Sequence, residues 1–347
     1  MFNRSANTFL FNFLGSDFLK LNIMAKDLFG NEITEKQTIN RFDLEKILFA
    51  KMSSITLEEF VRLITNDFNE LVEYAKLLRG GKTCQKTSLL FNPHRLTTKT
   101  KTSKISIYDA LKTENFISGL ARATIFKDGK VNELLYQVLQ LGINGVQYVN
   151  EFPPHIARDL YLEYKLDANS KILDPCAGWG GRMLGASVVS NSYTCFEPST
   201  KTYNGLNKLF LFIKNMNNDF NAEIHCLPFE KSNLQSNYFD FAFTSPPYYD
   251  TEEYSNEETN SLMAYNSFEK WCEMFYLPMI EKTMDSLKKD CSFVINIGSR
   301  IYPLNEVLIN NFADRYEISK GKDRLSGKSG LKSNTKEGET FYRIQKS

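Results

Sequence analysis

The sequence of 347 residues has few of the features that build metal sites or disulfide frameworks. It contains only three histidines, and its six cysteines form no Cys-x-x-Cys pair (Cys84, Cys176, Cys195, Cys226, Cys272 and Cys291). Zinc ligands and the cysteines of disulfide-rich folds are spaced more closely than this. We therefore expect buried, reduced thiols and no bound metal.

Long apolar runs are also lacking. Residues 1–21 carry Phe and Leu, but Asn, Asp, Arg and Lys interrupt them, so the segment fits neither a signal peptide nor a membrane span. A cytoplasmic location is the default expectation. With 42% hydrophobic and 24% charged residues, the composition is that of a soluble globular protein, and the length favours two structural units.

Nor is there an excess of one charge, because the formal net charge is only +1. Any affinity for nucleic acid must therefore come from a local cluster of cations. Residues 82–112 hold such a cluster, with seven Lys or Arg against one acid. This basic segment is either a solvated connection or a surface that tracks phosphates, and the two interpretations are compatible.

Two kinds of periodicity divide the chain. Over residues 5–78 the apolar residues recur at helical spacing, as in Leu44 and Leu48. From residue 170 onward, short apolar runs alternate with helical patterns, which predicts a mostly parallel sheet with helices on both faces. One of these helices is expected to begin at Asn266 and to be interrupted at Pro278. We predict a mainly helical region at 1–147 and a sheet domain at 148–347.

A glycine-rich turn follows the first predicted strand of the sheet, in the segment Ile-Leu-Asp-Pro-Cys-Ala-Gly-Trp-Gly-Gly-Arg that ends at Arg182. Gly178, Gly180 and Gly181 allow the backbone to approach a ligand closely, and ligands of open α/β sheets bind at such turns. Glu197 follows the second strand, about 20 residues further on, where an acid can accept hydrogen bonds from a ribose. A tight connection or another kind of dinucleotide site remains an alternative.

The fourth strand ends in Ser245, Pro246, Pro247 and Tyr248. Two prolines in succession fix φ and remove two N–H donors, so the carbonyls of this turn and the Ser245 hydroxyl can accept hydrogen bonds from an amine. Tyr248 offers a flat face for stacking a base. A simple strand end or a polyproline recognition element is the alternative.

Together these segments resemble the class I S-adenosylmethionine-dependent methyltransferases. Asp-Pro-Cys-Ala-Gly-Trp-Gly-Gly is similar to their first motif, and the acid after the second strand is similar to their second. Thr-Ser-Pro-Pro-Tyr resembles motif IV of the DNA amino-methyltransferases, and the motif order resembles that of their gamma group. The resemblance implies a Rossmann-like α/β fold whose last strand is antiparallel, with the catalytic domain at 148–347 and a helical N-terminal region.

The resemblance also implies a set of site residues. The cofactor, S-adenosylmethionine, is expected at the glycine turn, at the acid after the second strand, beside the segment after the third strand, and at the Phe-x-Pro element upstream (Phe152, Asp174, Cys176, Ala177, Gly178, Trp179, Gly180, Glu197, Pro198, Phe229 and Thr244). Phe152 is expected to cover the methionine end and Phe229 to border the adenine. The catalytic residues are expected to be Ser245, Pro246, Pro247 and Tyr248.

The function implied by the resemblance is methylation of an exocyclic amino group of a flipped DNA base. A leading Ser favours cytosine N4 over adenine N6, and carbon-5 methylation is disfavoured because this motif has no cysteine. The alternatives are a methyltransferase for an RNA base and an inactive nucleic-acid-binding relative. Fewer than 100 residues follow Asp250, too few for a separate recognition domain, so substrate contacts are expected from residues 1–147, 251–264 and 320–337.

Overall fold

The computed structural model describes residues 40–65, 68–82, 86–124, 139, 142–147, 149–298, 301–321 and 340–346. Contacts divide the chain into two units. The helical unit comprises Met1–Asn69 and Pro93–Asn150, and the sheet unit comprises Glu70–Asn92 and Glu151–Ser347. Residues 70–92, which precede the boundary expected from the sequence, thus pack with the sheet.

The described part of the helical unit consists of short elements. These are α3 (Arg41–Met52), α4 (Leu57–Thr65), η1 (Pro93–Thr97), the two-residue strand β1 (Lys99–Thr100), α7 (Ile107–Ala110) and α8 (Glu114–Thr124). Asn40 caps α3 by accepting a hydrogen bond from the Asp43 amide, 3.0 Å away. Leu44, Leu48 and Phe60 are buried, as the helical spacing predicts. The predicted helices before residue 40 lie outside the described residues.

The sheet unit contains seven strands in the order β4-β3-β2-β5-β7-β9-β8. They are β2 (Lys171–Asp174), β3 (Ser192–Phe196), β4 (Asn221–His225), β5 (Phe239–Thr244), β7 (Leu287–Ile297), β8 (Tyr316–Lys320) and β9 (Thr340–Lys346). The first five strands of this series are parallel, and β9 is antiparallel to both of its neighbours. This is the Rossmann-like, mostly parallel sheet that the sequence predicts, with the last strand antiparallel.

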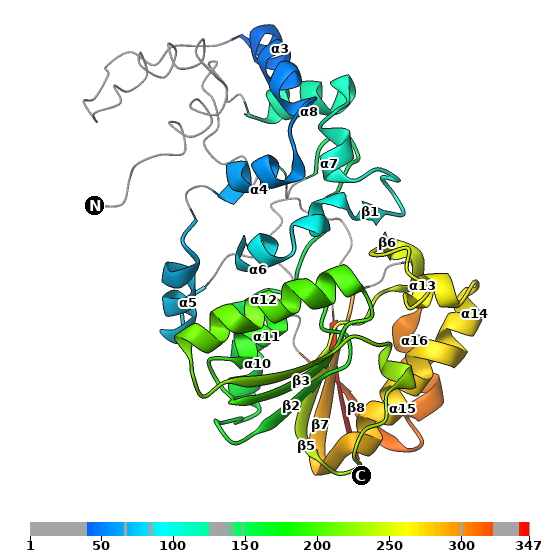
Figure 1. Cartoon of the computed structure of the whole chain (residues 1–347). Coiled ribbons are helices and arrows are strands. Elements are labelled where there is room, and N and C mark those ends of the chain that lie inside the picture. The colour runs from blue at the N-terminus through cyan, green and yellow to red at the C-terminus, as the bar shows by residue number, and fades with distance from the viewer. Residues whose placement is uncertain are drawn as a thin grey trace. The chain divides into compact units, whose positions relative to one another are not determined.

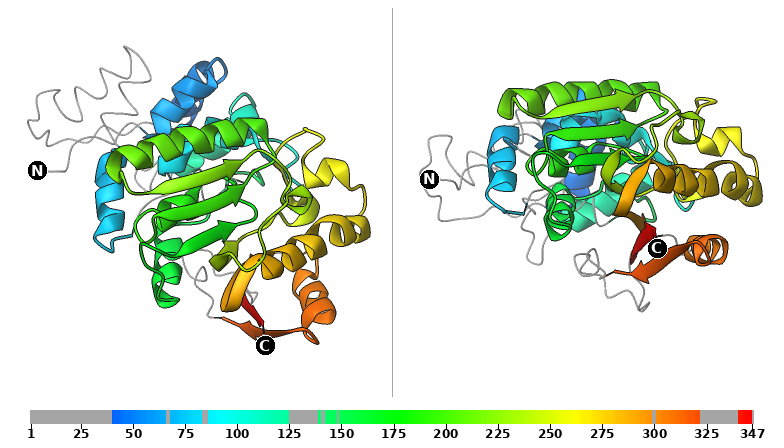
Figure 2. Two further views of the ribbon diagram at one scale, coloured as in Figure 1. Left: turned by 60° about the horizontal axis from the view of Figure 1, so that its bottom comes forward. Right: turned by 90° about the horizontal axis from the view of Figure 1, so that it is seen from below.

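Helices cover both faces of this sheet (Figures 1 and 2). On one face lie α10 (Pro154–Glu163), α11 (Gly181–Ala186) and α12 (Thr200–Met216), together with α5 (Glu70–Leu78) and α6 (Lys86–Phe91). On the other lie α14 (Phe268–Trp271), α15 (Leu277–Ser286) and α16 (Leu304–Phe312). Successive strand residues alternate between the faces, so Ile172 packs in the first core and Leu173 in the second.

The helix before β7 begins and continues differently from the prediction. Its N-cap is Ser267, whose hydroxyl accepts from the Lys270 amide at 3.2 Å, and not Asn266. Pro278 does not interrupt it, because the π-helical turn η5 (Cys272–Tyr276) precedes α15 and the proline occupies the first turn of that helix. A missing N–H is harmless in a first turn.

The remaining short elements of the sheet unit are η3 (Phe229–Lys231), η4 (Tyr249–Thr251), β6 (Glu252–Glu253) and α13 (Ser261–Ala264). No helix among the described residues is long and apolar enough to cross a membrane. Likewise, the described residues contain no group of three His, Cys, Asp or Glu side chains placed to hold a metal ion. Most of the predicted basic loop at 320–337 lies outside the described residues.

Candidate functional site

The ends of β2 and β5 lie side by side in the centre of the sheet. The two strands are parallel neighbours, so the turns that follow Asp174 and Thr244 emerge at the same edge. The Thr244 hydroxyl donates to Asp174 Oδ1 at 2.9 Å and accepts from the Cys176 amide at 3.1 Å. One buried side chain thereby joins the glycine turn to the strand that carries the Ser-Pro-Pro-Tyr segment.

Asp174 is fully buried and organises the glycine turn from beneath. Besides Thr244, its carboxylate accepts from Arg182 Nε at 2.8 Å and from the Tyr193 hydroxyl at 2.5 Å. Burial alone would lower the pKa of Arg182, but the attraction of Asp174 raises it above its ordinary value, so the guanidinium stays charged. Arg182 also donates to the Cys176 carbonyl. The two charges fix the course of the backbone through the turn.

The glycine turn has the backbone that its sequence predicts. Gly178 and Gly180 are in the left-handed region, with φ of 55° and 93°. A Cβ on Gly180 would lie 2.5 Å from Leu209, whereas a Cβ on Gly178 would have no atom within 4 Å. The turn is therefore packed against α12 at Gly180 and open at Gly178. The Trp179 carbonyl accepts from Asn92 Nδ2 at 3.1 Å, so the residue that directly follows α6 braces the turn.

Glu197 follows β3 and faces this turn. Its carboxylate accepts from the Ser199 amide at 2.9 Å and from the backbone of Gly178. Burial raises its pKa from 4.5 to about 8, and the two backbone hydrogen bonds offset only part of that effect. The next residue, Pro198, accepts a hydrogen bond through its carbonyl from Thr259, at 3.0 Å. The structure therefore brings an acid that holds its proton near neutrality next to the open side of the turn.

The segment after β4 carries Phe229, which the sequence analysis predicts as a site residue, and Glu230, which it does not. Phe229 is 1% exposed and packs edge-to-face on Phe196, with ring centroids 5.0 Å apart. Its neighbour Glu230 accepts from the Tyr265 hydroxyl at Oε1 (3.1 Å), while Oε2 is buried and has no hydrogen-bond partner among the described residues. Burial raises the pKa of Glu230. An acid directly beside the predicted site residue Phe229 was the signal that could have identified it.

The Ser-Pro-Pro-Tyr turn is held by a residue from a distant segment. Ser245 Oγ lies 3.2 Å from the Tyr248 hydroxyl. Asn296, near the end of β7, donates from Nδ2 to Ser245 Oγ at 3.3 Å. Its backbone carbonyl accepts from the Tyr248 hydroxyl, also at 3.3 Å. Asn296 is 1% exposed. Because its hydroxyl is anchored, the Tyr248 ring has a fixed orientation at the end of the sheet.

An aromatic cluster continues from this turn. Tyr249 adopts φ of 55°, and its ring packs edge-on against Phe268, Trp271 and Tyr302 at 5.3 to 6.0 Å. The Tyr302 hydroxyl donates to Asp250 Oδ1 at 2.5 Å. The two residues that follow the turn are thus held by ring contacts and by this hydrogen bond.

Phe152 lies in the core next to the glycine turn. It is 9% exposed, and its ring packs edge-to-face against Phe243 at 5.0 Å and Phe341 at 6.1 Å. Its carbonyl oxygen would be 2.1 Å from a Cβ on Gly181. The segment thereby supports the start of α11, and glycine is required at position 181 because of this close approach.

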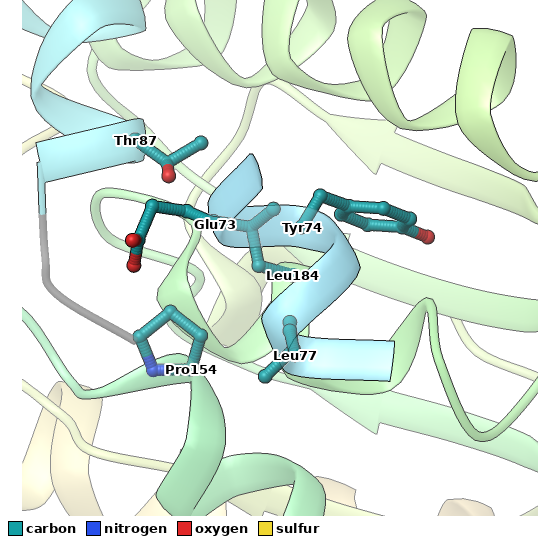
Figure 3. Close-up of a pocket in the computed structure, with 6 residues that line it drawn as sticks. All are labelled: Glu73, Tyr74, Leu77, Thr87, Pro154 and Leu184. Carbon is teal, nitrogen blue, oxygen red and sulfur yellow. The ribbon is translucent and has the colours of Figure 1, made fainter. Parts of the chain in front are cut away.

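A small pocket of the sheet unit lies elsewhere (Figure 3). It is lined by Glu73, Tyr74, Leu77, Thr87, Pro154 and Leu184. Tyr74 reaches Ser187, at the carboxyl end of α11, with its hydroxyl 3.1 Å from the Ser187 hydroxyl. The glycine turn is at the opposite end of that helix, so this pocket is separate from the candidate site.

Comparisons with known proteins describe the fold alone. No protein-family model matches the chain, and no curated protein matches it. Among solved structures, a tRNA methyltransferase of Aquifex aeolicus is 12% identical, with 57% of this chain and 71% of that chain covered and a TM-score of 0.40. An rRNA methylase of Streptococcus thermophilus is 16% identical, with 57% and 98% covered and a TM-score of 0.37. An O-methyltransferase of Thermotoga maritima is 10% identical, with 57% and 68% covered and a TM-score of 0.39.

Proposed function

We propose that the chain transfers a methyl group from S-adenosylmethionine to an exocyclic amino group of a nucleic-acid base, DNA being favoured over RNA and cytosine N4 over adenine N6. The observation that carries the proposal is the joining of the glycine turn to the Ser-Pro-Pro-Tyr strand through Thr244 and Asp174. A cofactor at the first turn and a base at the second would then be neighbours, as group transfer requires.

The residues around the glycine turn fit an adenosyl group. Gly178 leaves room for a ligand to approach the backbone, and Glu197 presents carboxyl oxygens to which ribose hydroxyls could donate. Oε2 of Glu230, which is buried and has no hydrogen-bond partner among the described residues, is an acceptor that an adenine amino group could satisfy. Trp179 and Phe229 would border the group, and Phe196 supports Phe229 from beneath. The cofactor, when bound, supplies an electrophilic methyl group on a sulfonium.

The Ser-Pro-Pro-Tyr turn has the groups that an aromatic amine needs. The lone pair of such an amine is delocalised into its ring, so the nitrogen must be held and repolarised before it can attack. The turn carbonyls and Ser245 Oγ can accept from the two N–H groups, and one of these protons passes to water as the nitrogen is alkylated. Tyr248, anchored through Asn296, offers its ring for stacking, which offsets part of the cost of unstacking the base.

We also propose that the helical unit and its basic segment contribute to substrate binding. Lys99, Lys101, Lys104 and Lys112 are exposed in this unit, within a stretch whose one acid is Asp109. Exposed cations in such a group release condensed counterions when they contact phosphates.

The proposed activity is tested by incubating the full chain with tritiated S-adenosylmethionine and, separately, with duplex DNA, single-stranded DNA and tRNA. We expect label in DNA, and a protein with Ser245 and Tyr248 both replaced by Ala serves as the background control. Label in tRNA alone would assign the activity to RNA. Label in none of the three, from a protein that binds the cofactor, would contradict the proposal.

A further inference from the structure

The segment between η4 and α13, residues 252–260, is docked on the amino end of α12. We call it the strap. Both carboxylate oxygens of Glu257 accept from the Thr200 amide at 3.1 Å, and Glu257 Oε2 also accepts from the Thr200 hydroxyl at 2.7 Å. The Ser199 hydroxyl lies 3.3 Å from Oε1. Helix amino ends have unpaired N–H groups and a positive partial charge, so a carboxylate is well suited to this position.

Two further contacts connect the strap to the proposed cofactor-binding residues. Thr259 donates to the Pro198 carbonyl at 3.0 Å, directly beside Glu197. Tyr254 packs against Trp179 of the glycine turn, with ring centroids 5.9 Å apart. The strap therefore contacts the segment that carries Glu197 as well as the glycine turn itself.

The strap is braced internally, so Glu257 does not reach α12 as a flexible side chain. The Glu257 amide donates to Ser255 Oγ at 3.0 Å, and Asn260 Nδ2 donates to the Ser255 carbonyl at 2.6 Å. The Asn260 amide donates in turn to the Glu257 carbonyl at 2.9 Å. Burial alone would raise the pKa of Glu257, yet hydrogen bonds from Thr200, Ser255 and Ser199 hold it below its ordinary value. The anchoring carboxylate is charged throughout the neutral range.

From these contacts we infer that the strap is a positioning element for the cofactor, and that Glu257 is its anchor. The inference rests on the proposed function, and it assigns a role to residues outside the family motifs. By fixing residues 198–200, Glu257 and Thr259 hold Glu197 in place, while Tyr254 holds Trp179. Because η4 (Tyr249–Thr251) connects Tyr248 to the strap, the strap also links the cofactor side of the site to the base side along the chain.

The test measures how S-adenosylhomocysteine binds to the full chain. Calorimetry gives the affinity, and stopped-flow measurements of the intrinsic tryptophan fluorescence give the dissociation rate. Glu257→Gln removes the charge at the helix end but keeps the side-chain shape. Glu258→Gln, which removes the charge of the exposed neighbouring residue, is the matched control. We expect Glu257→Gln to weaken binding about tenfold, mainly through faster dissociation, which is the magnitude typical of a charge-assisted hydrogen bond. Glu258→Gln should bind within about twofold of the wild type.

A second variant distinguishes a strap that positions the cofactor from a strap that only stabilises the amino end of α12. Thr259→Val removes the contact with Pro198 and leaves Glu257 in place, so it should also speed dissociation, whereas the melting temperature without ligand should stay nearly constant. If Glu257→Gln only lowers that melting temperature and Thr259→Val binds like the wild type, the strap is structural and the inference is wrong. Equal affinity of Glu257→Gln and Glu258→Gln would also overturn it and leave the proposed function intact. A wild-type protein that does not bind S-adenosylhomocysteine would overturn both.

Discussion

The hydroxyl of Thr244 donates a 2.9 Å hydrogen bond to the fully buried carboxylate of Asp174. Thr244 ends one parallel strand and Asp174 ends its neighbour, and the same hydroxyl accepts from the Cys176 amide. Asp174 in turn is paired with Arg182. Two turns that are about 70 residues apart in the sequence are thereby held as a single rigid edge, on which the proposed transfer depends.

Replacing Thr244 by Val keeps the shape of the side chain but removes this link. The Cys176 amide loses an acceptor and Asp174 loses a donor, so we expect the free energy of unfolding to fall by about 1–3 kcal/mol. Urea unfolding followed by circular dichroism measures this. Thr244→Ser, which retains the hydroxyl, should recover most of the loss, and equal destabilisation by both variants would show that the hydrogen bonds are unimportant.

Changes at Tyr248 should affect turnover and not cofactor binding, because its proposed role concerns the base alone. Tyr248→Ala should lower kcat by about a hundredfold or more, since it removes the stacking face. Tyr248→Phe retains the ring but loses the contacts with Ser245 and Asn296, so it should lower kcat only severalfold. Steady-state kinetics and cofactor titration check this. If Tyr248→Ala also loses affinity for the cofactor, Tyr248 belongs to the cofactor-binding part of the site and not to the part that holds the base.

The raised pKa of Glu197 predicts a pH dependence of the cofactor-free protein. With a pKa of about 8 in the folded state, against 4.5 ordinarily, the folded protein keeps a proton that the unfolded chain releases. The stability that Glu197 contributes is therefore greatest below about pH 4.5 and falls as the pH rises to about 8. Glu197→Gln should flatten this part of the melting-temperature profile, and an unchanged profile would mean that another group is responsible.

The same residue predicts proton release on ligand binding. Ribose hydroxyls that donate to Glu197 would favour its charged form, so at pH 7 the bound state should hold less of this proton than the ligand-free state. Calorimetry of S-adenosylhomocysteine binding, in buffers of different ionisation enthalpy, counts the protons released. The wild type should release more than Glu197→Gln, and equal release by the two would exclude Glu197 as a hydrogen-bond partner of the ligand.

Glu230 Oε2, which has no hydrogen-bond partner in the described part of the chain, predicts a preference for an amino group on the purine. S-inosylhomocysteine, which carries a carbonyl oxygen at that position, would face the carboxylate with a second acceptor. The wild type should bind it at least about tenfold more weakly than S-adenosylhomocysteine, and Glu230→Gln should narrow the difference because an amide can donate to the carbonyl. If the two ligands differ in affinity by the same factor in the wild type and in Glu230→Gln, the purine does not bind beside Glu230.

Much of the sheet could be predicted from the sequence, because each strand is a short apolar run followed by a turn. The left-handed glycines at 178 and 180 and the stiff Pro246–Pro247 turn are local features, and local chemistry determines them. The π-helical turn before Pro278 was not predictable in this way, since it depends on how the helix packs on the second face of the sheet.

Residues that act across long sequence separations were missed for the same reason. Asn296 gives no sign in its own strand that it contacts Ser245 and Tyr248, about 50 residues earlier. Asn92 lies in a helical segment assigned to the N-terminal region, yet it braces Trp179. Such contacts arise from the register of neighbouring strands and from helix packing, and neither is encoded in a local pattern.

The central claim is that the two joined turns bring a methyl group to an exocyclic amine. It is tested most directly by methylating DNA with S-adenosylmethionine that carries a deuterated methyl group, digesting the product to nucleosides and locating the label by mass spectrometry. The account predicts label on an exocyclic nitrogen, with N4-methylcytosine in excess of N6-methyladenine. Label on cytosine carbon 5 or on a ribose oxygen, with an unmodified exocyclic nitrogen, would contradict it.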